Sequence, residues 1–288
     1  MNIQSECIIC IFNQAHRVTC ELGLDEKTTK KVLDESAKML PSFSMDKTPP
    51  KNATPMYHMI SKLLDKPDLY YEVKQKSIKK AEAFIPDCKQ AIKESSNPFL
   101  TATKIAVAGN VIDLASEFEF DLGTELEKVL ETDFAIDDTK SFFEKLQNSV
   151  TIVYLADNAG ENVFDRLYIE ILKNLFKNIE VYYFVRSTPI INDITYDELK
   201  EDLINEVATL IDSGVQTPGI IVEDLNDKAK LLFDKADCII SKGMGNFECL
   251  SENSEYPIYY LLKVKCNVVA NALNKEVGDI ICKSAQKI

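Results

Sequence analysis

The sequence predicts an α/β protein with a mostly parallel central sheet flanked by helices, in a Rossmann-like three-layer arrangement. From residue 149 onward, short apolar β-branched runs alternate with helix-like amphipathic segments, which is typical of a parallel sheet. Before residue 149 the patterns are helical and no strong strand is evident. We therefore expect a mainly helical N-terminal subdomain at 1–148 and an α/β catalytic subdomain at 149–288, together forming one compact unit.

The first half contains apolar residues at helix-like intervals, broken by proline. The helices predicted there span 21–40, 70–84, 103–117, 122–130 and 139–146. The run at 48–52, which contains two prolines, predicts a loop. Pro86 is expected to end the second of these helices and Pro98 to start the third.

The second half carries the strand signals. Strands are predicted at 149–156, 179–185, 219–222, 238–241, 256–262 and 266–269. Helices are predicted between them at 163–176, 197–206 and 228–235. The order of the strands in the sheet does not follow from these patterns.

Composition narrows the classes of function. The chain of 288 residues has a formal net charge of −13, which argues against nucleic acid and anionic membranes as main partners. A small phosphorylated molecule stays possible, because a metal or a few local cations can reverse the field in one cleft. No apolar run approaches the roughly 20 residues of a membrane span, and the first 12 residues lack a signal-peptide pattern. We expect a cytoplasmic protein whose eight cysteines are mostly reduced.

The ligands available for a metal are mainly oxygens. The chain has only two histidines, His16 and His58, so a site built on several histidines is impossible. A catalytic cation would depend on carboxylate and amide groups, which suit hard or borderline divalent metals.

The strongest candidate site is Asp157-Asn158-Ala159-Gly160-Glu161, directly after one predicted strand and before a helix. Ligands in open α/β sheets bind at the carboxyl ends of strands. Asp157 and Asn158 could share a cation there, and Gly160 would let a phosphate approach the start of the helix. The alternative is that Asp157 or Asn158 only caps the helix.

Two further segments follow strands. Arg186 stands after the next strand with Asn192-Asp193, which suggests a second carboxylate and a guanidinium for phosphate oxygens. The alternative is a helix cap and a surface arginine.

The loop Lys242-Gly243-Met244-Gly245-Asn246 follows the strand at 238–241 and could bind an oxyanion. It lacks the spacing of a P-loop and of a dinucleotide fingerprint. The alternative here is an ordinary glycine turn.

Two weaker patterns lie in the helical half. Asn110 and Asp113 are three residues apart and would share a helix face, although a solvated polar face explains them equally. Cys7 and Cys10 form a CxxC, which fits a buried structural pair, a redox pair or half of a metal site.

Taken in order, these segments resemble the damage-control phosphatase family, long catalogued as a domain of unknown function with an acidic-residue methyltransferase-like label. The matching residues run through nearly the whole chain: Cys7 and Cys10 with Gln14, Gly109-Asn110 with Asp113, Asp157-Asn158-Ala159-Gly160-Glu161 with Asp165, Arg186 with Pro189 and Asn192-Asp193, Ser213-Gly214 with Pro218-Gly219, and Lys242-Gly243 with Gly245-Asn246 and Glu248. Met244 and Ala108 depart from the pattern, where glutamine and arginine would be expected. The CxxC resembles the prokaryotic-type branch.

The resemblance implies a metal-dependent phosphatase acting on small phosphorylated metabolites, either sugar phosphates or damaged phospho-metabolites. It implies that Asp157, Asn158 and Asp193 hold a divalent cation such as Mn, Co, Ni or Mg. Glu161 is added to the expected catalytic residues. The expected substrate- or phosphate-binding residues are Asn110, Asp113, Gly160, Arg186, Asn192, Lys242, Gly243, Gly245 and Asn246.

The chemical step and the class of protein keep alternatives. Either a water molecule or Asp157 itself could attack phosphorus. A carboxyl methyltransferase using S-adenosylmethionine is one alternative function, and a non-catalytic metal- or metabolite-binding protein is another. The patterns do not predict the oligomeric state.

Overall fold

The parallel sheet predicted from the second half of the chain is present in a computed structural model, which describes residues 1–111, 127–128 and 130–286. Within those residues the sheet has seven strands in the order β1-β7-β6-β5-β2-β3-β4. All neighbouring strands are parallel except β6 and β7. The strands are β1 (Ile136–Asp137), β2 (Thr151–Leu155), β3 (Glu180–Val185), β4 (Thr209–Asp212), β5 (Cys238–Lys242), β6 (Ile258–Lys263) and β7 (Ile280–Ser284).

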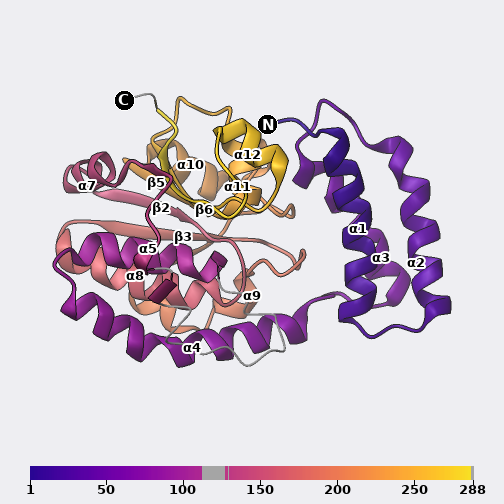
Figure 1. The fold of residues 1–288 in the computed structure, drawn as a ribbon, viewed down its shortest axis with the longest axis horizontal. Helices are drawn as coiled ribbons and strands as arrows, with labels where there is room; N and C mark the ends of the chain where they lie inside the picture. Colours follow the sequence, from indigo (N-terminus) through magenta and orange to yellow (C-terminus); the bar gives the residue numbers. More distant parts are fainter. Residues whose placement is uncertain (112–126, 129, 287–288) are drawn as a thin grey trace.

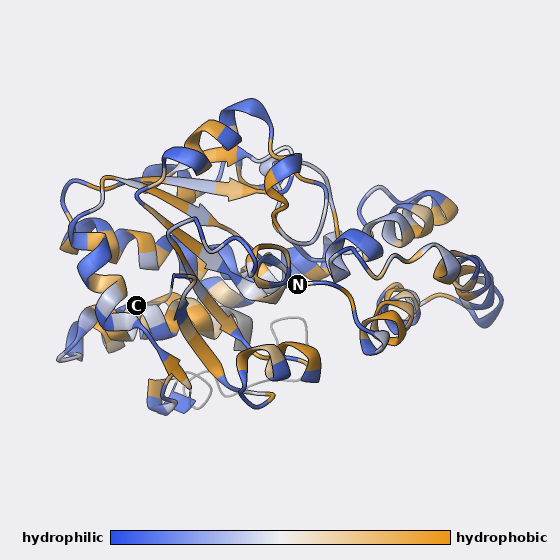
Figure 2. Cartoon of the chain, turned by 90° about the horizontal axis from the view of Figure 1, so that it is seen from above, coloured by the Kyte–Doolittle hydropathy of each residue, from blue (hydrophilic) through white to orange (hydrophobic). Residues whose placement is uncertain are grey.

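Helices cover both faces of the sheet (Figure 1). One face packs with α4 (Tyr71–Glu94), α5 (Pro98–Val111), α7 (Thr139–Gln147) and α8 (Glu161–Leu175). The other face packs with α10 (Asp227–Lys235), α11 (Gly243–Leu250) and α12 (Asn267–Leu273). A short helix, α9 (Tyr196–Leu199), lies beside β4. Figure 2 shows hydrophobic residues concentrated on the strands and hydrophilic residues alternating with them on the helices.

The first three helices form a separate lobe beside the sheet (Figure 1). They are α1 (Ser5–Glu21), α2 (Glu26–Met39) and α3 (Pro49–Leu64). Their buried residues form a hydrophobic cluster of their own, which Ile190 and Val268 join from the α/β part. By contrast α4, α5 and α7 share the core of the sheet, although they precede residue 149.

Two helix boundaries that were predicted from proline positions were wrong. The segment predicted as a loop at 48–52 begins α3, because Thr48 caps the helix and Pro49 and Pro50 occupy its first turn, where a missing N–H costs nothing. Pro86 does not end α4, which continues to Glu94. Phe84, Cys88 and Ile92 lie on both sides of it and are buried against α8 and its neighbours, so packing outweighs the lost hydrogen bond.

Two strands predicted in the second half were wrong, and the helix predicted at 197–206 is two short pieces, α9 and a 3-10 helix at Leu203–Glu206. Residues 219–222 are not a strand, because Gly219 has φ of +152° and its Cα approaches the backbone of Gly245. The strand that lies between β3 and β5 in the chain is β4, which had not been predicted. Residues 266–269 begin α12 rather than a strand. The strand β7, which is antiparallel to β6, had not been predicted.

Several predictions fall where little is described. The helix predicted at 103–117 corresponds to α5, and residues 112–117 lie outside the described residues. The same is true of most of the helix predicted at 122–130. No helix among the residues that the structure describes is long and apolar enough to cross a membrane.

Phe142 tests the docking of α7 on the sheet. Its fully buried ring stacks on Tyr259 of β6 with ring centroids 4.5 Å apart. We expect Phe142→Ala to lower the free energy of unfolding by about 3–5 kcal/mol, measured by urea denaturation, because the emptied space cannot collapse. Leu231→Ala on the exposed face of α10 is the control and should change it by less than about 0.5 kcal/mol. Equal effects of the two variants would contradict this packing.

Candidate functional site

The predicted site residues lie where the order of strand addition in the sheet reverses. From β2 the chain adds β3 and β4 on one side, and it then returns to add β5 on the other side of β2. The loops that leave β2 and β5 therefore diverge at their carboxyl ends, which is where open α/β sheets bind ligands. Asp157 follows β2, and Gly243 follows β5.

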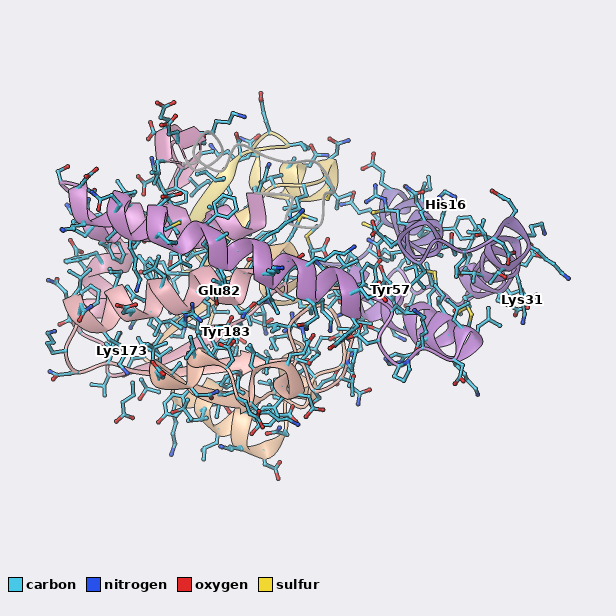
Figure 3. All side chains as sticks on the ribbon, turned by 90° about the horizontal axis from the view of Figure 1, so that it is seen from below. His16, Lys31, Tyr57, Glu82, Lys173 and Tyr183 are labelled. Atoms are coloured by element: carbon cyan, nitrogen blue, oxygen red, sulfur yellow. The ribbon has the colours of Figure 1, made fainter. Side chains whose placement is uncertain are left out.

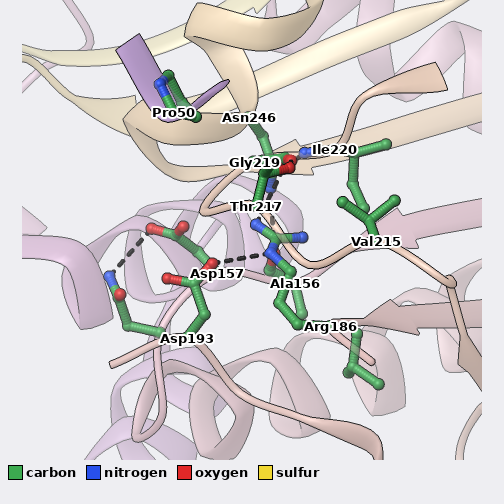
Figure 4. Close-up of polar contacts among 12 residues, drawn as sticks. Pro50, Ala156, Asp157, Arg186, Asp193, Val215, Thr217, Gly219, Ile220 and Asn246 are labelled. Atoms are coloured by element: carbon green, nitrogen blue, oxygen red, sulfur yellow. Dashed lines mark hydrogen bonds and ion pairs between the residues drawn. The ribbon is translucent and has the colours of Figure 1, made fainter. Parts of the chain in front are cut away.

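The structure brings Asp157, Asn158 and Asp193 together. Asn158 and Asp193 pair as an isolated β-bridge, and the N–H of Ile194 donates to the carbonyl oxygen of Asp157 at 3.0 Å. The amide nitrogen of Asn158 donates to Asp157 Oδ2 and to Glu161 Oε1, both at 3.0 Å. Figure 4 shows the side chains of Asp157 and Asp193 next to each other. Both are buried, with exposed fractions of 7% and 1%.

Arg186 lies behind the carboxylates instead of on an open surface. Its Nε donates to Asp193 Oδ2 at 2.8 Å, and its Nη2 donates to Asn246 Oδ1 at 3.2 Å (Figure 4). The side chain is only 1% exposed. Arg186 therefore acts as the counterion of Asp193 in this structure, and it does not line the cavity described below.

Lys242 is also an internal counterion. Its Nζ lies 3.0 Å from Glu161 Oε2 and 2.7 Å from Asp165 Oδ1, and the side chain is fully buried. Asp165 accepts further hydrogen bonds from the hydroxyls of Tyr154 and Tyr183, at 2.6 and 2.8 Å. Glu161 thus joins this network to the amide of Asn158. Sequence reasoning found Glu161 and Lys242 but not the pair that they make.

The glycines after β5 allow a close approach of backbone to carboxylate. Gly243 has φ of +77°, and a Cβ built there would lie 1.9 Å from Asp157 Oδ2, so only glycine fits. The segment is not a glycine turn, because Gly243 begins α11. A Cβ built at Gly245 would lie 2.2 Å from the carbonyl oxygen of Pro218.

Asn246 and Gly160 have internal partners. The Asn246 amide donates to the carbonyl oxygens of Ala156 and Lys242, and its Oδ1 also accepts from the N–H of Ile220. The N–H of Gly160, directly before α8, donates to Asn162 Oδ1 at 2.8 Å. These contacts cross-link the loops around the site.

The two site residues predicted in the helical half, Asn110 and Asp113, lie at or beyond the edge of the described residues. Gly109 of α5 packs against Glu161 and Phe164, which places that helix beneath the start of α8. Asn110 belongs to α5, but the placement of its side chain is not described, and Asp113 lies outside the described residues.

Burial disfavours the charged forms of the Asp157 and Asp193 carboxyl groups. Burial raises the pKa of Asp157 well above its usual value, and the nearby charges of Glu161 and Asp193 raise it further. Burial likewise raises the pKa of Asp193 to about 6, although Arg186 opposes the shift. Burial also opposes ionisation of Glu161, but Lys242 and Lys265 outweigh it and lower the pKa of Glu161. A cation beside Asp157 would remove the repulsion.

The donor set fits a hard divalent cation. It offers two carboxylates and one amide, all oxygen ligands. Asp193 Oδ1 is buried and has no hydrogen-bond partner within the described residues, which leaves it available as a ligand. Among the residues that the structure describes, no three His, Cys, Asp or Glu side chains converge on one point, so the set depends on Asn158.

A cavity of about 740 Å³ opens at this edge of the sheet, between the lobe of α1–α3 and the α/β part. Asp157, Asn158 and Asn192 lie on its wall together with Gly245 and Lys265. The opposite wall comes from α1 and the start of α3, and includes Cys7, Cys10, Gln14, Arg17 and Pro50. The N-terminal helices and the loops at the edge of the sheet therefore line one cavity.

Lys265 is the residue that sequence reasoning missed. It is exposed on the cavity wall, forms no ion pair within the described part of the chain, and acts electrostatically on Asp157 and Glu161. It stands two residues after β6, as Asp157 stands two residues after β2. This position was a signal, but the strand wrongly predicted at 266–269 obscured it.

Comparisons with known proteins agree on one family. The model of the damage-control phosphatase ARMT1-like domain matches residues 3–281. A damage-control phosphatase of Pyrococcus horikoshii is 34% identical over 284 residues, covering 98% of each chain. One of Archaeoglobus fulgidus is 31% identical over 297 residues, covering 98% of this chain and 99% of the relative. The crystal structure of a DUF89 family protein from Pyrococcus horikoshii has a TM-score of 0.91 at 33% identity, covering 99% of this chain and all of the other.

The two lysines near the site should differ in what they stabilise. We expect Lys242→Met to lower the free energy of unfolding by about 3–5 kcal/mol, because it leaves Glu161 and Asp165 buried without their counterion. The matched variant Lys265→Met removes an exposed charge and should change it by less than about 0.5 kcal/mol. Urea denaturation of both variants measures this, and a stable Lys242→Met protein would refute the counterion role.

Proposed function

The chain belongs to the damage-control phosphatase ARMT1-like domain family, and from that membership we propose that it is a metal-dependent phosphatase of small phosphorylated metabolites. The reaction would take place where Asp157 and Asn158, with Asp193 buried beside them, line the cavity. The names of the two archaeal relatives support the phosphatase activity. Sugar phosphates and damaged phospho-metabolites are the proposed substrates, since the cavity of about 740 Å³ has the size of sites for small molecules.

The observation that carries the metal dependence is the pair of buried carboxylates, Asp157 and Asp193, which lie next to each other at the carboxyl edge of the sheet. Without a cation, Asp157 and Asp193 would repel a phosphate dianion. Asp193 Oδ1 also lacks a hydrogen-bond partner among the described residues. We propose that Asp157, Asn158 and Asp193 hold a divalent cation such as Mn, Co, Ni or Mg. The chemistry that such a cation supplies is neutralisation of the phosphoryl oxygens and polarisation of the phosphorus.

The chain's own groups position the partners of the reaction. Arg186 fixes the orientation of the Asp193 carboxylate, and Glu161 fixes the Asn158 amide. Because Arg186 and Lys242 are buried in ion pairs, Lys265 is the proposed ligand for a substrate phosphate oxygen. Asn192, Gly243 and Gly245 remain proposed contacts of the substrate at the same edge.

Water is the proposed nucleophile. Asp157 Oδ2 accepts a hydrogen bond from Asn158 and packs against Gly243, which holds the carboxylate in a fixed orientation suited to ligation. A methyltransferase would need a nucleoside pocket at the first strand–helix loop, whereas in the described residues that loop carries the carboxylate and amide cluster. A protein that only binds metal or metabolite differs from the proposal in turnover alone.

Removal and return of metal tests the proposal. We expect chelator-stripped protein to be inactive on a generic aryl phosphate and to regain activity with one or more of Mg, Mn, Co and Ni. Asp157→Ala should lower kcat by about a thousand-fold or more under every metal, because it removes a ligand and the charge that holds the cation. Circular dichroism checks that the variant is folded. Equal metal-dependent turnover in Asp157→Ala would refute the site.

Lys265 should affect the substrate and not the metal. We expect Lys265→Met to lower kcat/KM by about ten-fold to a hundred-fold, because one charge-assisted hydrogen bond to phosphate is lost. The metal affinity measured by calorimetry should stay within about three-fold of the unaltered protein. The control is Lys263→Met, two residues earlier on β6 and absent from the cavity wall. Equal kinetic losses in both variants would contradict a specific role for Lys265.

A further inference from the structure

Three cysteine thiols lie on the wall of the cavity that holds the proposed phosphatase site. Cys7 and Cys10 come from the first turns of α1, and Cys266 directly precedes α12. They are close enough for Cys7 to interact electrostatically with both Cys10 and Cys266. No residue role proposed above uses any of these thiols.

Cys10 is the thiol that an incoming molecule meets first. It is exposed on the cavity wall. Gln14, one turn further along α1, donates its amide N–H to Cys10 Sγ at 3.8 Å. The hydroxyl of Tyr57 donates to Gln14 Oε1 at 2.8 Å, which orients that amide. Figure 3 places Tyr57 where the lobe of α1–α3 meets the rest of the protein.

Cys7 is the buried member of the pair. Its Sγ accepts the N–H of Gln4 at 3.5 Å and takes part in the capping box of α1. Burial raises the pKa of the Cys7 thiol, which keeps it protonated until another group takes its proton. Residues three apart on a helix have Cα atoms about 5 Å apart, from the rise and radius of the helix. This Cα separation lies within the range of a disulfide, and closing the bond requires the two Cβ atoms to move from about 5–6 Å to about 4 Å apart.

We propose that Cys10 and Cys7 form a thiol–disulfide exchange site for low-molecular-weight disulfides of the glutathione disulfide class that enter the cavity. The Cys10 thiolate attacks one sulfur of the small disulfide, forms a mixed disulfide and releases one small thiolate. Cys7 then loses its proton to that released thiolate and attacks Cys10 Sγ. The products are the Cys7–Cys10 disulfide and a second small thiol, so two electrons pass from the protein to the small disulfide.

The modification would lie inside the substrate cavity. A mixed disulfide on Cys10 occupies space opposite Asp157, and the internal disulfide withdraws Cys7 from the capping box of α1. Loss of phosphatase activity on oxidation follows if the proposed function is correct. The exchange reaction itself is measured by mass, so its outcome does not depend on that function.

The chain contains a matched control on the same helix. Cys20 is exposed on α1 and contacts His16, but it is absent from the cavity wall. Position 17, three residues before it, is an arginine. Cys20 can therefore take up a small thiol, but it has no thiol at the spacing that would displace it.

The test is incubation of the full chain with glutathione disulfide, followed by peptide mapping of its disulfides. We expect a Cys7–Cys10 disulfide that dithiothreitol reverses, while Cys20 carries only glutathione. Cys7→Ser should retain glutathione on Cys10, and Cys10→Ser should show no modification at Cys7. Phosphatase activity of the oxidised protein should fall and return with dithiothreitol, and Cys20→Ser should behave as the unaltered protein.

Three results would overturn the proposal. The first is a Cys10 that stays unmodified while Cys20 reacts. The second is a disulfide that joins Cys10 to Cys266 instead of Cys7. The third is a Cys7 that takes up glutathione in the Cys10→Ser variant. A protein that forms the Cys7–Cys10 disulfide but hydrolyses no phosphate would retain the exchange site and refute the phosphatase.

Discussion

The arrangement of the site depends on two cations buried beneath it. Arg186 pairs with Asp193, and Lys242 pairs with Glu161 and Asp165, all at exposed fractions of 2% or less. An isolated buried carboxylate would be driven to protonate, so a cluster of four acids at one edge of a sheet requires internal counterions. These pairs let Asp193 and Glu161 remain charged while Asp157 is left with an excess of negative charge around it. That excess is what a divalent cation would relieve.

The same pairs divide the basic residues into two roles. Arg186 and Lys242 form ion pairs inside the protein. Arg186 orients Asp193, and Lys242 orients Glu161, which accepts a hydrogen bond from Asn158. Lys265 stays exposed on the cavity wall and forms no ion pair among the described residues, so its charge would be available to a ligand. The wall across from it comes from α1, which contributes Cys10 and Gln14 as well as the carboxylate of Glu6. The proposed phosphatase site on one wall and the proposed thiol site on the other would then open to the same cavity.

Much of the fold was predictable because local patterns carry it. The runs at β2, β3 and β5 are apolar and β-branched on both faces, as buried parallel strands are. The helix α8 followed from its amphipathic spacing. Local signals failed where tertiary contacts outweighed them: Pro86 lies within α4 because its neighbours are buried against α8, and the Gly219 loop is shaped by its approach to Gly245. The strand β7 gave no periodic signal that separates it from a buried helix segment.

The sequence by itself determined which residue types stand at the carboxyl ends of the strands. Asp157 and Asn158 were identified because they follow β2 closely, Asp193 because it lies in the segment after β3, and Lys242 because it stands at the end of β5. Only the tertiary structure decided which of them face the cavity and which face each other. The strand order places β5 beside β2, and this brings Lys242 under Glu161 and Gly243 against Asp157. Distances between segments 80 residues apart depend on how the sheet is assembled, and no local spacing encodes them.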